Sequence, residues 1–150
     1  MKIYSLLVTA CMLMLATGCS GTKSARGFSL PDGDSTRGQA TFVELHCHTC
    51  HTVSSVELPE LDPKPERPIA LGGQVARLKT YGELVTSIIN PSHRIAKGYP
   101  MEAVETEGQS KMTNYNDILT VSQLIDLVAF LEAHYELEPY DPTEYPPIFP

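Results

Sequence analysis

The chain has 150 residues, a formal net charge of −7 and 42% hydrophobic residues. This length is enough for one domain core but short for two. Asp and Glu outnumber Lys and Arg by 18 to 11, which argues against nucleic acid as a partner, because a phosphate backbone attracts basic surfaces.

The first 18 residues have the composition of an export signal. Lys2 is followed by an apolar stretch, residues 3–16, that is too short to span a bilayer as a helix. Residues 15–19, LATGC, resemble the lipobox of bacterial lipoproteins, in which cleavage precedes the cysteine. Ala16 stands where that family usually has Leu, so cleavage by the ordinary signal peptidase stays an alternative.

The lipobox resemblance implies that Cys19 carries a diacylglyceryl group. Two or more acyl chains give stable membrane attachment, so we expect a lipid-anchored protein facing the periplasm of a bacterium. The residue after the cysteine is Ser20, and a residue other than Asp at this place resembles the pattern of Gram-negative lipoproteins that are sent to the outer membrane. The following residues, up to Ser35, are rich in Gly, Ser, Thr, Asp and Pro, and residues 19–35 are therefore predicted to be a flexible tether.

The run Cys47-His48-Thr49-Cys50-His51 has the spacing of a c-type haem attachment motif. In such a motif the Cys47 and Cys50 thiols add to the two vinyl groups of the porphyrin, and the His51 imidazole binds the iron. The sequence therefore predicts one covalently bound haem c.

Two other interpretations of these cysteines remain open. Thiols and imidazoles also bind zinc, and His46 adds another imidazole close in sequence to the two cysteines. A structural zinc site, however, usually takes its remaining ligands from a second cysteine pair, which the chain lacks. A redox-active dithiol is the other interpretation, although that chemistry does not need a histidine directly after the second cysteine.

Thr36 is predicted to cap a helix that runs over residues 37–45 into this motif. Gly38 and Phe42 on this helix, followed by the haem motif, resemble the start of class I monohaem cytochromes c. The resemblance implies a small all-α fold around one haem over residues 36–137. It also implies that the glycine allows a close crossing by the last helix and that the aromatic ring packs there.

A proline-rich loop, residues 58–68, follows the motif and cannot form regular helix. In class I cytochromes c, a backbone carbonyl near a proline accepts a hydrogen bond from the Nδ1–H of the axial histidine. Pro68, Ile69 and Leu71 resemble that segment, so we expect them to line the haem pocket.

Two further helices are predicted after this loop. Residues 81–89 have helical composition and are stopped by Asn90-Pro91. A last helix opens at Thr120, where Gln123 completes a capping box, and its apolar residues recur at helical spacing; these residues are Val121, Leu124, Ile125, Val128 and Leu131. Residues 138–150 form a tail rich in Pro, Tyr and acidic residues, which we expect to wrap the surface or to be disordered.

The sixth iron ligand decides between electron transfer and an open site. Met112 occupies the place of the ligand methionine in the family, just before the final helix. Met101 and His93 are alternatives, since both lie between the last two predicted helices. We expect His46 and His48 to be exposed neighbours of the motif, and His134 to lie on the last helix away from the iron.

These features predict a one-electron carrier with no catalytic residues and no small-molecule substrate. Its donor and acceptor would be redox proteins, and its acidity favours partners with a basic docking patch. One alternative is a haem sensor or ligand-binding lipoprotein with an open distal site. Another is the electron-accepting subunit of a dehydrogenase or oxidase.

Overall fold

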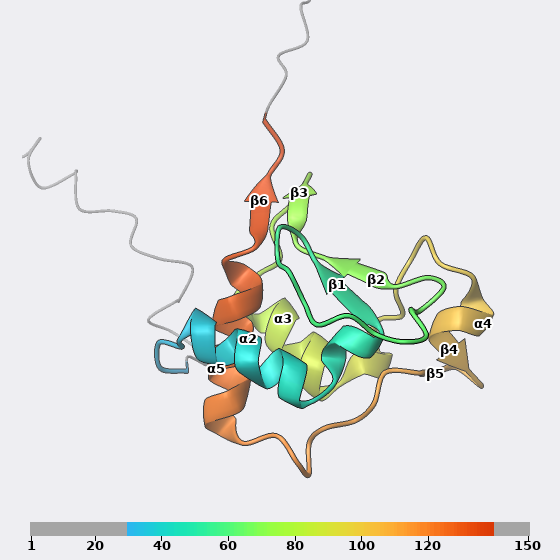
Figure 1. The fold of residues 1–150 in the computed structure, drawn as a ribbon, viewed down its shortest axis with the longest axis horizontal. Coiled ribbons are helices and arrows are strands. Elements are labelled where there is room, and N and C mark those ends of the chain that lie inside the picture. The colour runs from blue at the N-terminus through green and yellow to red at the C-terminus, as the bar shows by residue number, and fades with distance from the viewer. Residues whose placement is uncertain (1–29, 140–150) are drawn as a thin grey trace, which may run out of the picture. The chain divides into compact units, whose positions relative to one another are not determined.

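A computed structural model describes residues 30–139, and those from Pro31 onward belong to one compact unit (Figure 1). The predicted signal peptide, Cys19, most of the tether and the tail from residue 140 lie outside the described residues. Within residues 30–139, no helix is both long and apolar enough to cross a membrane.

Helices form most of the described core, and short strands join the loops between them. The helices are α2 (Ser35–Glu44), α3 (Tyr81–Ile89), α4 (Met101–Val104) and α5 (Val121–Glu132), with 3₁₀ turns η2 (Cys47–Thr49) and η3 (Pro91–His93). The strands are β1 (His51–Val53), β2 (Ile69–Leu71), β3 (Gly73–Val75), β4 (Glu105–Thr106), β5 (Gln109–Ser110) and β6 (Tyr135–Leu137).

The strands pair only two by two, as β1 with β2, β3 with β6, and β4 with β5. The first two pairs are parallel and the third is antiparallel. The expectation of an all-α fold is therefore too narrow, although the helical core is present. These short ladders pair backbone amide and carbonyl groups of the connections between the helices.

Helix α2 begins two residues earlier than predicted, and Asp34 rather than Thr36 caps it. The Asp34 Oδ1 accepts a hydrogen bond from the Arg37 backbone N–H at 2.9 Å. Asp34 is fixed in this place because its own backbone N–H donates to Asp126 Oδ1 on α5 at 2.7 Å. A partner distant in sequence thus decides which of two good capping residues starts the helix.

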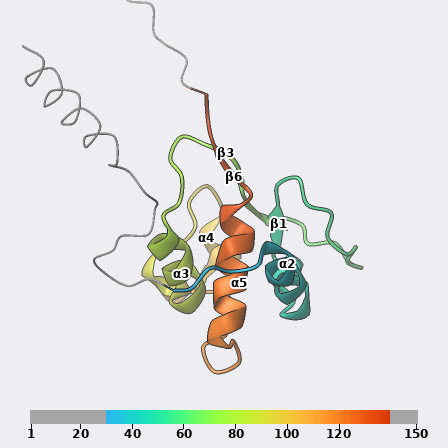
Figure 2. The ribbon, with the colours of Figure 1, turned by 90° about the vertical axis from the view of Figure 1, so that its left-hand side faces the viewer.

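Helices α2 and α5 cross in close contact at Gly38, as predicted. A Cβ atom at this position would collide with the Asp126 carbonyl oxygen and would lie 2.6 Å from the Phe130 Cβ. One turn further along α2, the Phe42 ring packs against Phe130 with 5.6 Å between the ring centroids. Both rings are buried. In Figure 2, α5 lies between α2 on one side and α3 on the other.

An ion pair holds the same crossing at its edge. The Arg37 guanidinium donates from Nε to Asp126 Oδ2 at 2.7 Å and from its terminal NH2 group to Asp126 Oδ1 at 3.0 Å. Asp126 is buried and accepts the Asp34 backbone N–H as well. Its carboxylate therefore bonds both the side chain and the backbone of the segment that starts α2.

Helices α3 and α5 are each capped by two residues that lie close together in the sequence at the start of the helix. Thr120 and Gln123 form the predicted capping box of α5, and Thr80 and Glu83 form an equivalent box on α3. The end of α3 before Pro91 is also as predicted. The buried apolar side chains are Phe42, Val53, Tyr81, Leu84, Val85, Ile88, Val104, Leu127, Val128, Phe130 and Leu131. On α5, Leu127 is buried whereas Val121, predicted on the apolar face, is 64% exposed.

Replacing Gly38 with Ala is expected to destabilise the fold by about 1–3 kcal/mol, because the added methyl group has no room at the helix crossing. Chemical denaturation of the haem-loaded protein, followed by circular dichroism, measures this. Gly82→Ala is the matched control, since no atom lies within 4 Å of a Cβ at this helical position. It should be neutral or stabilising by up to about 1 kcal/mol. Equal effects of the two changes would contradict the close crossing.

The Asp126 carboxylate should make stability depend on acid pH. Hydrogen bonds from Arg37 and from the Asp34 backbone hold the pKa of Asp126 below its ordinary value. As pH falls below about 4, Asp126 is therefore protonated in the unfolded chain before it is protonated in the folded protein. The contribution of its carboxylate to the free energy of unfolding decreases over this range and is lost as pH passes through the folded-state pKa. Asp126→Asn is expected to lower stability at neutral pH and to flatten this part of the acid dependence.

Denaturant unfolding over a pH series of about 2 to 6 measures that dependence for the wild type and for Asp126→Asn. Asp117→Asn, which removes an exposed carboxylate, controls for the change in net charge. If the stability curves of the wild type and Asp126→Asn ran parallel down to the lowest pH, the proposed linkage would be wrong.

Candidate functional site

The Cys-His-Thr-Cys-His run lies at a sharp reversal after α2. The helix ends at Glu44, and His46 adopts a left-handed conformation with φ of 57°. Histidine is among the residues that tolerate this region comparatively well. The chain then enters η2, which carries Cys47, and His51 opens β1. Cys47 is half-buried, Cys50 is exposed, and both thiols are free.

The protonation state of Cys47 bears on the two other interpretations of the motif. Burial raises the pKa of the Cys47 thiol to about 11. Redox-active and zinc-binding cysteines work as thiolates and usually have lowered pKa values. Among residues 30–139, no group of three or more His, Cys, Asp and Glu side chains is arranged to hold a metal ion. The environment of Cys47 therefore gives no support to a redox dithiol.

Ile69 contacts Cys50 and His51 through its two backbone polar groups. The Ile69 backbone N–H donates to the Cys50 carbonyl oxygen at 2.8 Å, and the His51 Nδ1 lies 3.3 Å from the Ile69 carbonyl oxygen. Burial lowers the pKa of His51, so its imidazole is favoured in the neutral form. A neutral ring that donates from Nδ1 keeps the lone pair on Nε2 for a metal ion.

The segment expected to surround that ring forms β2 and the residue before it. Pro68, Ile69 and Leu71 are all half-buried, and Ile69 is the Cα partner of His51 in the parallel β1–β2 pair. The sequence did not predict a strand here. It did, however, single out the segment whose carbonyl group lies beside His51 Nδ1.

A hydrogen bond joins the segment around Met112 to the chain just before the Cys47–His51 motif. The Tyr115 hydroxyl donates to the Leu45 carbonyl oxygen at 2.8 Å, two residues before Cys47. Burial and the nearby Cys47 raise the pKa of Tyr115. Met112 is half-buried, and its backbone N–H donates to the Ser110 Oγ at 3.1 Å. Nothing in the sequence marked Tyr115, because its partner is a backbone group 70 residues away.

The two alternative ligands, Met101 and His93, have exposed side chains. Met101 opens α4 and is 56% exposed. His93 ends η3 and is exposed, and its Nδ1 lies 2.8 Å from the Asn90 carbonyl oxygen. Residues beside each of them are bonded near the site, since the Ala70 N–H donates to the Tyr99 hydroxyl at 3.0 Å and the Ser110 N–H donates to the Ser92 Oγ at 3.0 Å.

The remaining histidines differ from expectation at two positions. His48 was expected to be exposed but is only 8% exposed, because the 3₁₀ turn directs it inward, and its Nδ1 has no hydrogen-bond partner within the described part of the chain. His134 lies just beyond α5 instead of on it. Its Nδ1 is 2.7 Å from the Phe130 carbonyl oxygen, and its ring meets Phe130 edge-on. His46 is exposed as predicted.

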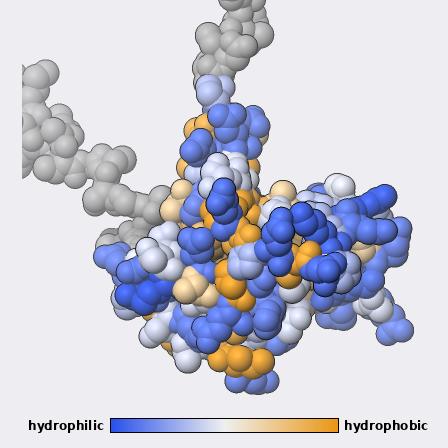
Figure 3. Space-filling model, in the orientation of Figure 1, coloured by the Kyte–Doolittle hydropathy of each residue, from blue (hydrophilic) through white to orange (hydrophobic). Residues whose placement is uncertain are grey.

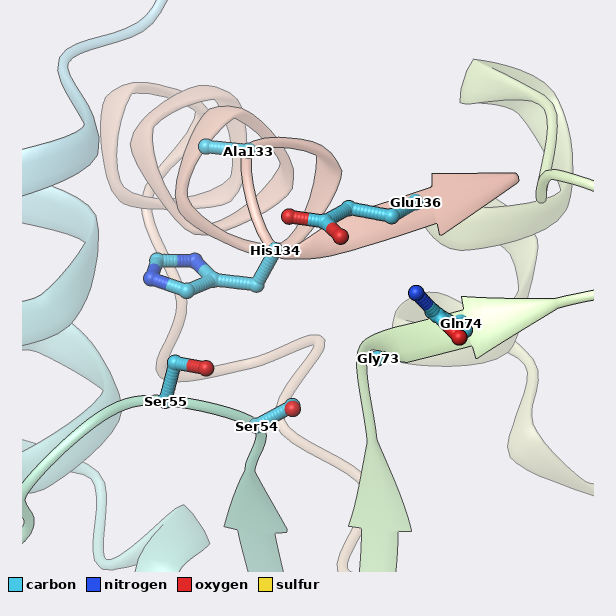
Figure 4. Close-up of a pocket in the computed structure, with 7 residues that line it drawn as sticks. All are labelled: Ser54, Ser55, Gly73, Gln74, Ala133, His134 and Glu136. Atoms are coloured by element: carbon cyan, nitrogen blue, oxygen red, sulfur yellow. The ribbon is translucent and has the colours of Figure 1, made fainter. Parts of the chain in front are cut away.

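A separate cavity of about 240 Å³ lies beside His134 (Figure 4). It is lined by the loop after β1, the start of β3 and the chain that joins α5 to β6, with largely polar residues. None of its lining residues belongs to the Cys47–His51 motif or to the Met112 segment. This cavity is therefore not the place where the motif would hold a cofactor.

The described surface is uneven in polarity. Figure 3 shows an apolar area where the chain turns before α5, and hydrophilic surface over the side that carries α4. Ile118 and Val121, at this turn and at the start of α5, are 63% and 64% exposed. Ile118 thus belongs to the connection, residues 111–120, that contains Met112, and Val121 follows directly after this connection.

The donor set fits a covalently bound haem. Two free thiols three residues apart supply the thioether links, and the adjoining imidazole has its Nδ1 occupied by a backbone carbonyl. The buried His48 Nδ1, which has no hydrogen-bond partner among residues 30–139, fits a site that is completed by a group other than protein. Cys47, Cys50 and His51 are therefore the residues that would hold the haem.

Comparison with known proteins agrees with this chemistry. The family model of cytochrome c matches residues 35–134. No curated protein and no solved structure matches the chain. The family match spans α2, the motif and α5, and its members bind covalently attached haem c and transfer electrons. The chain belongs to the cytochrome c family.

Proposed function

We propose that this cytochrome c is a one-electron carrier with His51 and Met112 as axial haem ligands. We also propose that it is anchored through a lipidated Cys19 to a bacterial membrane and faces the periplasm. The haem, when bound, supplies an iron that takes up and releases a single electron. The protein's part is to hold two ligands, to keep water from the iron and to leave an edge of the site accessible.

The Tyr115–Leu45 hydrogen bond is the observation that carries the choice of Met112. It fastens the chain three residues after Met112 to the backbone two residues before Cys47. On the other side, the Ser110 backbone N–H donates to the Ser92 Oγ at 3.0 Å. Met112 is thus flanked by two fixed points, and one of them adjoins the haem motif.

A thioether opposite His51 would suit an electron carrier. Methionine favours the reduced iron and raises the potential relative to two histidines. A filled sixth position also limits access of oxygen or other small ligands. The exposure of Cys50, in contrast with the burial around Cys47, supports an accessible haem edge at which a partner can exchange electrons.

The surroundings of the site support redox proteins as partners. The chain is acidic overall, and a basic patch on a donor or acceptor would steer association at a rate that falls with salt. The exposed apolar residues Ile118 and Val121 adjoin the proposed ligand loop. An apolar centre with charged surroundings is a common composition of protein interfaces.

Met112→Ala is expected to abolish the weak near-red sulfur-to-iron absorption band of the oxidised protein and to lower the midpoint potential. The reduced variant should also bind carbon monoxide rapidly, because the sixth position becomes open. Optical spectra, redox titration and carbon monoxide mixing measure these changes. Met101→Ala, which changes an exposed methionine, is the matched control and should leave all three unchanged.

Three results would contradict this assignment. An unchanged potential in Met112→Ala would exclude Met112 as the ligand. Loss of the band in Met101→Ala would assign the ligand to Met101. Absence of the band in the wild type, with rapid carbon monoxide binding, would instead favour the haem sensor with an open distal site.

The anchor is tested by the chemistry of the mature N-terminus. We expect mass spectrometry to find a mature chain that begins at Cys19 and carries acyl chains, and labelled fatty acid to be incorporated. Cys19→Ser should abolish the labelling, whereas Cys11→Ser, within the predicted signal peptide, should retain it. A mature chain with an unmodified thiol at Cys19 would show that the ordinary signal peptidase processes the protein.

A further inference from the structure

The peptide group between Ile69 and Ala70 is hydrogen-bonded at both ends. Its carbonyl oxygen lies 3.3 Å from His51 Nδ1. Its N–H, which belongs to Ala70, donates to the Tyr99 hydroxyl oxygen at 3.0 Å. Because a peptide group is a single planar and polarisable unit, these contacts form one continuous chain from the Tyr99 hydroxyl to the His51 ring.

The strand pairing places this peptide group and leaves its N–H available. Ile69 is paired with His51, and the bond from Ile69 N–H to the Cys50 carbonyl fixes the register. The ladder continues with the bond from Ser54 N–H to the Leu71 carbonyl oxygen. Since alternate residues of a strand point their backbone groups to opposite sides, the Ala70 N–H is directed away from β1 and towards Tyr99.

The chain on either side of Tyr99 restricts its backbone. Gly98 has a φ of +86°, in the left-handed region that favours glycine. Pro100 follows, and a residue before proline is biased towards extended conformations. Tyr99 is itself half-buried. These constraints restrict the backbone from which the Tyr99 hydroxyl reaches the peptide group of β2.

We propose that Tyr99 is a positioning residue for His51 and acts through the Ile69–Ala70 peptide group. The inference rests on the proposed role of His51 as an iron ligand. Successive hydrogen bonds polarise one another, so a hydroxyl oxygen that accepts the Ala70 N–H makes the Ile69 carbonyl a stronger acceptor. A more strongly bound Nδ1 proton makes the imidazole a more basic ligand, which favours the oxidised iron and lowers the potential.

The same hydrogen bond also joins the segment before α4 to β2, so a purely structural role for Tyr99 must be distinguished. A structural role predicts lower stability without a specific effect on the His51 side of the haem. The positioning role predicts a higher midpoint potential and a faster solvent exchange of the His51 Nδ1 proton. These two properties report on the histidine itself.

The experiment uses the full, haem-loaded chain and removes the acceptor in two ways, because the donor belongs to the same peptide group as the Ile69 carbonyl and cannot be removed without altering it. Tyr99→Phe removes the hydroxyl alone. Tyr99→Leu removes the hydroxyl together with the ring. We expect each change to raise the equilibrium constant for reduction by about 1.5- to threefold, from the modest mutual strengthening of linked hydrogen bonds. A tenfold change is about 59 mV for one electron, so redox titration resolves this shift.

The comparison of the two variants and a control make the test decisive. Since both changes break the same hydrogen bond, Tyr99→Leu should shift the potential no further than Tyr99→Phe, although loss of the ring lowers stability more. NMR of the reduced protein should show faster exchange of the His51 Nδ1 proton in both variants. Tyr135→Phe, which makes the same chemical change on β6, should leave potential and exchange unchanged.

Several outcomes would overturn the inference. These are an unchanged potential and exchange rate in Tyr99→Phe, a larger shift in Tyr99→Leu than in Tyr99→Phe, or a shift accompanied by loss of the near-red methionine band. The wild-type spectrum tests the proposed Met112 ligation separately. If the wild type lacked the band but the two variants still shifted together, the proposed carrier would fail while the role of Tyr99 remained.

Discussion

The contact between α2 and α5 at Gly38 is the constraint on which the site depends. Since a side chain at that position would collide with the backbone of α5, the two helices approach as closely as their main chains permit. The Arg37–Asp126 ion pair and the Phe42–Phe130 ring contact then fix their relative rotation. The haem motif begins three residues after α2 ends, so its place follows from this crossing.

Backbone carbonyl groups carry much of the positioning around the proposed iron site. The Ile69 carbonyl lies against His51, and the Leu45 carbonyl accepts the hydroxyl of Tyr115 near Met112. Main-chain acceptors do not depend on the identity of the residue that provides them. They do depend on the path of the chain, which the β1–β2 pair and the end of α2 determine. The strands absent from an all-α description therefore help to position His51 in this cytochrome c.

Local patterns in the sequence predicted the parts of the fold that need only local partners. Helices α3 and α5 form where predicted, because the Thr120–Gln123 box and the Asn90–Pro91 stop act within a few residues. The place of Gly38 at the crossing was predicted from a family resemblance. Local sequence patterns gave wrong predictions where contacts with the rest of the fold decide the outcome. Asp34 caps α2 because Asp126 holds its backbone, and His48 turns inward within the reversal that follows α2.

The sequence by itself determined the chemistry of this protein. Two cysteines and a histidine at fixed spacing specify covalent haem attachment, since the reacting groups are neighbours along the chain. Only the tertiary structure decided which carbonyl meets His51, which loop approaches the haem motif and which hydroxyl reaches the Ile69–Ala70 peptide group. Those contacts join residues 18, 70 and 29 positions apart. Composition and periodicity do not specify such pairings, because these depend on how helices cross and how strands pair in three dimensions.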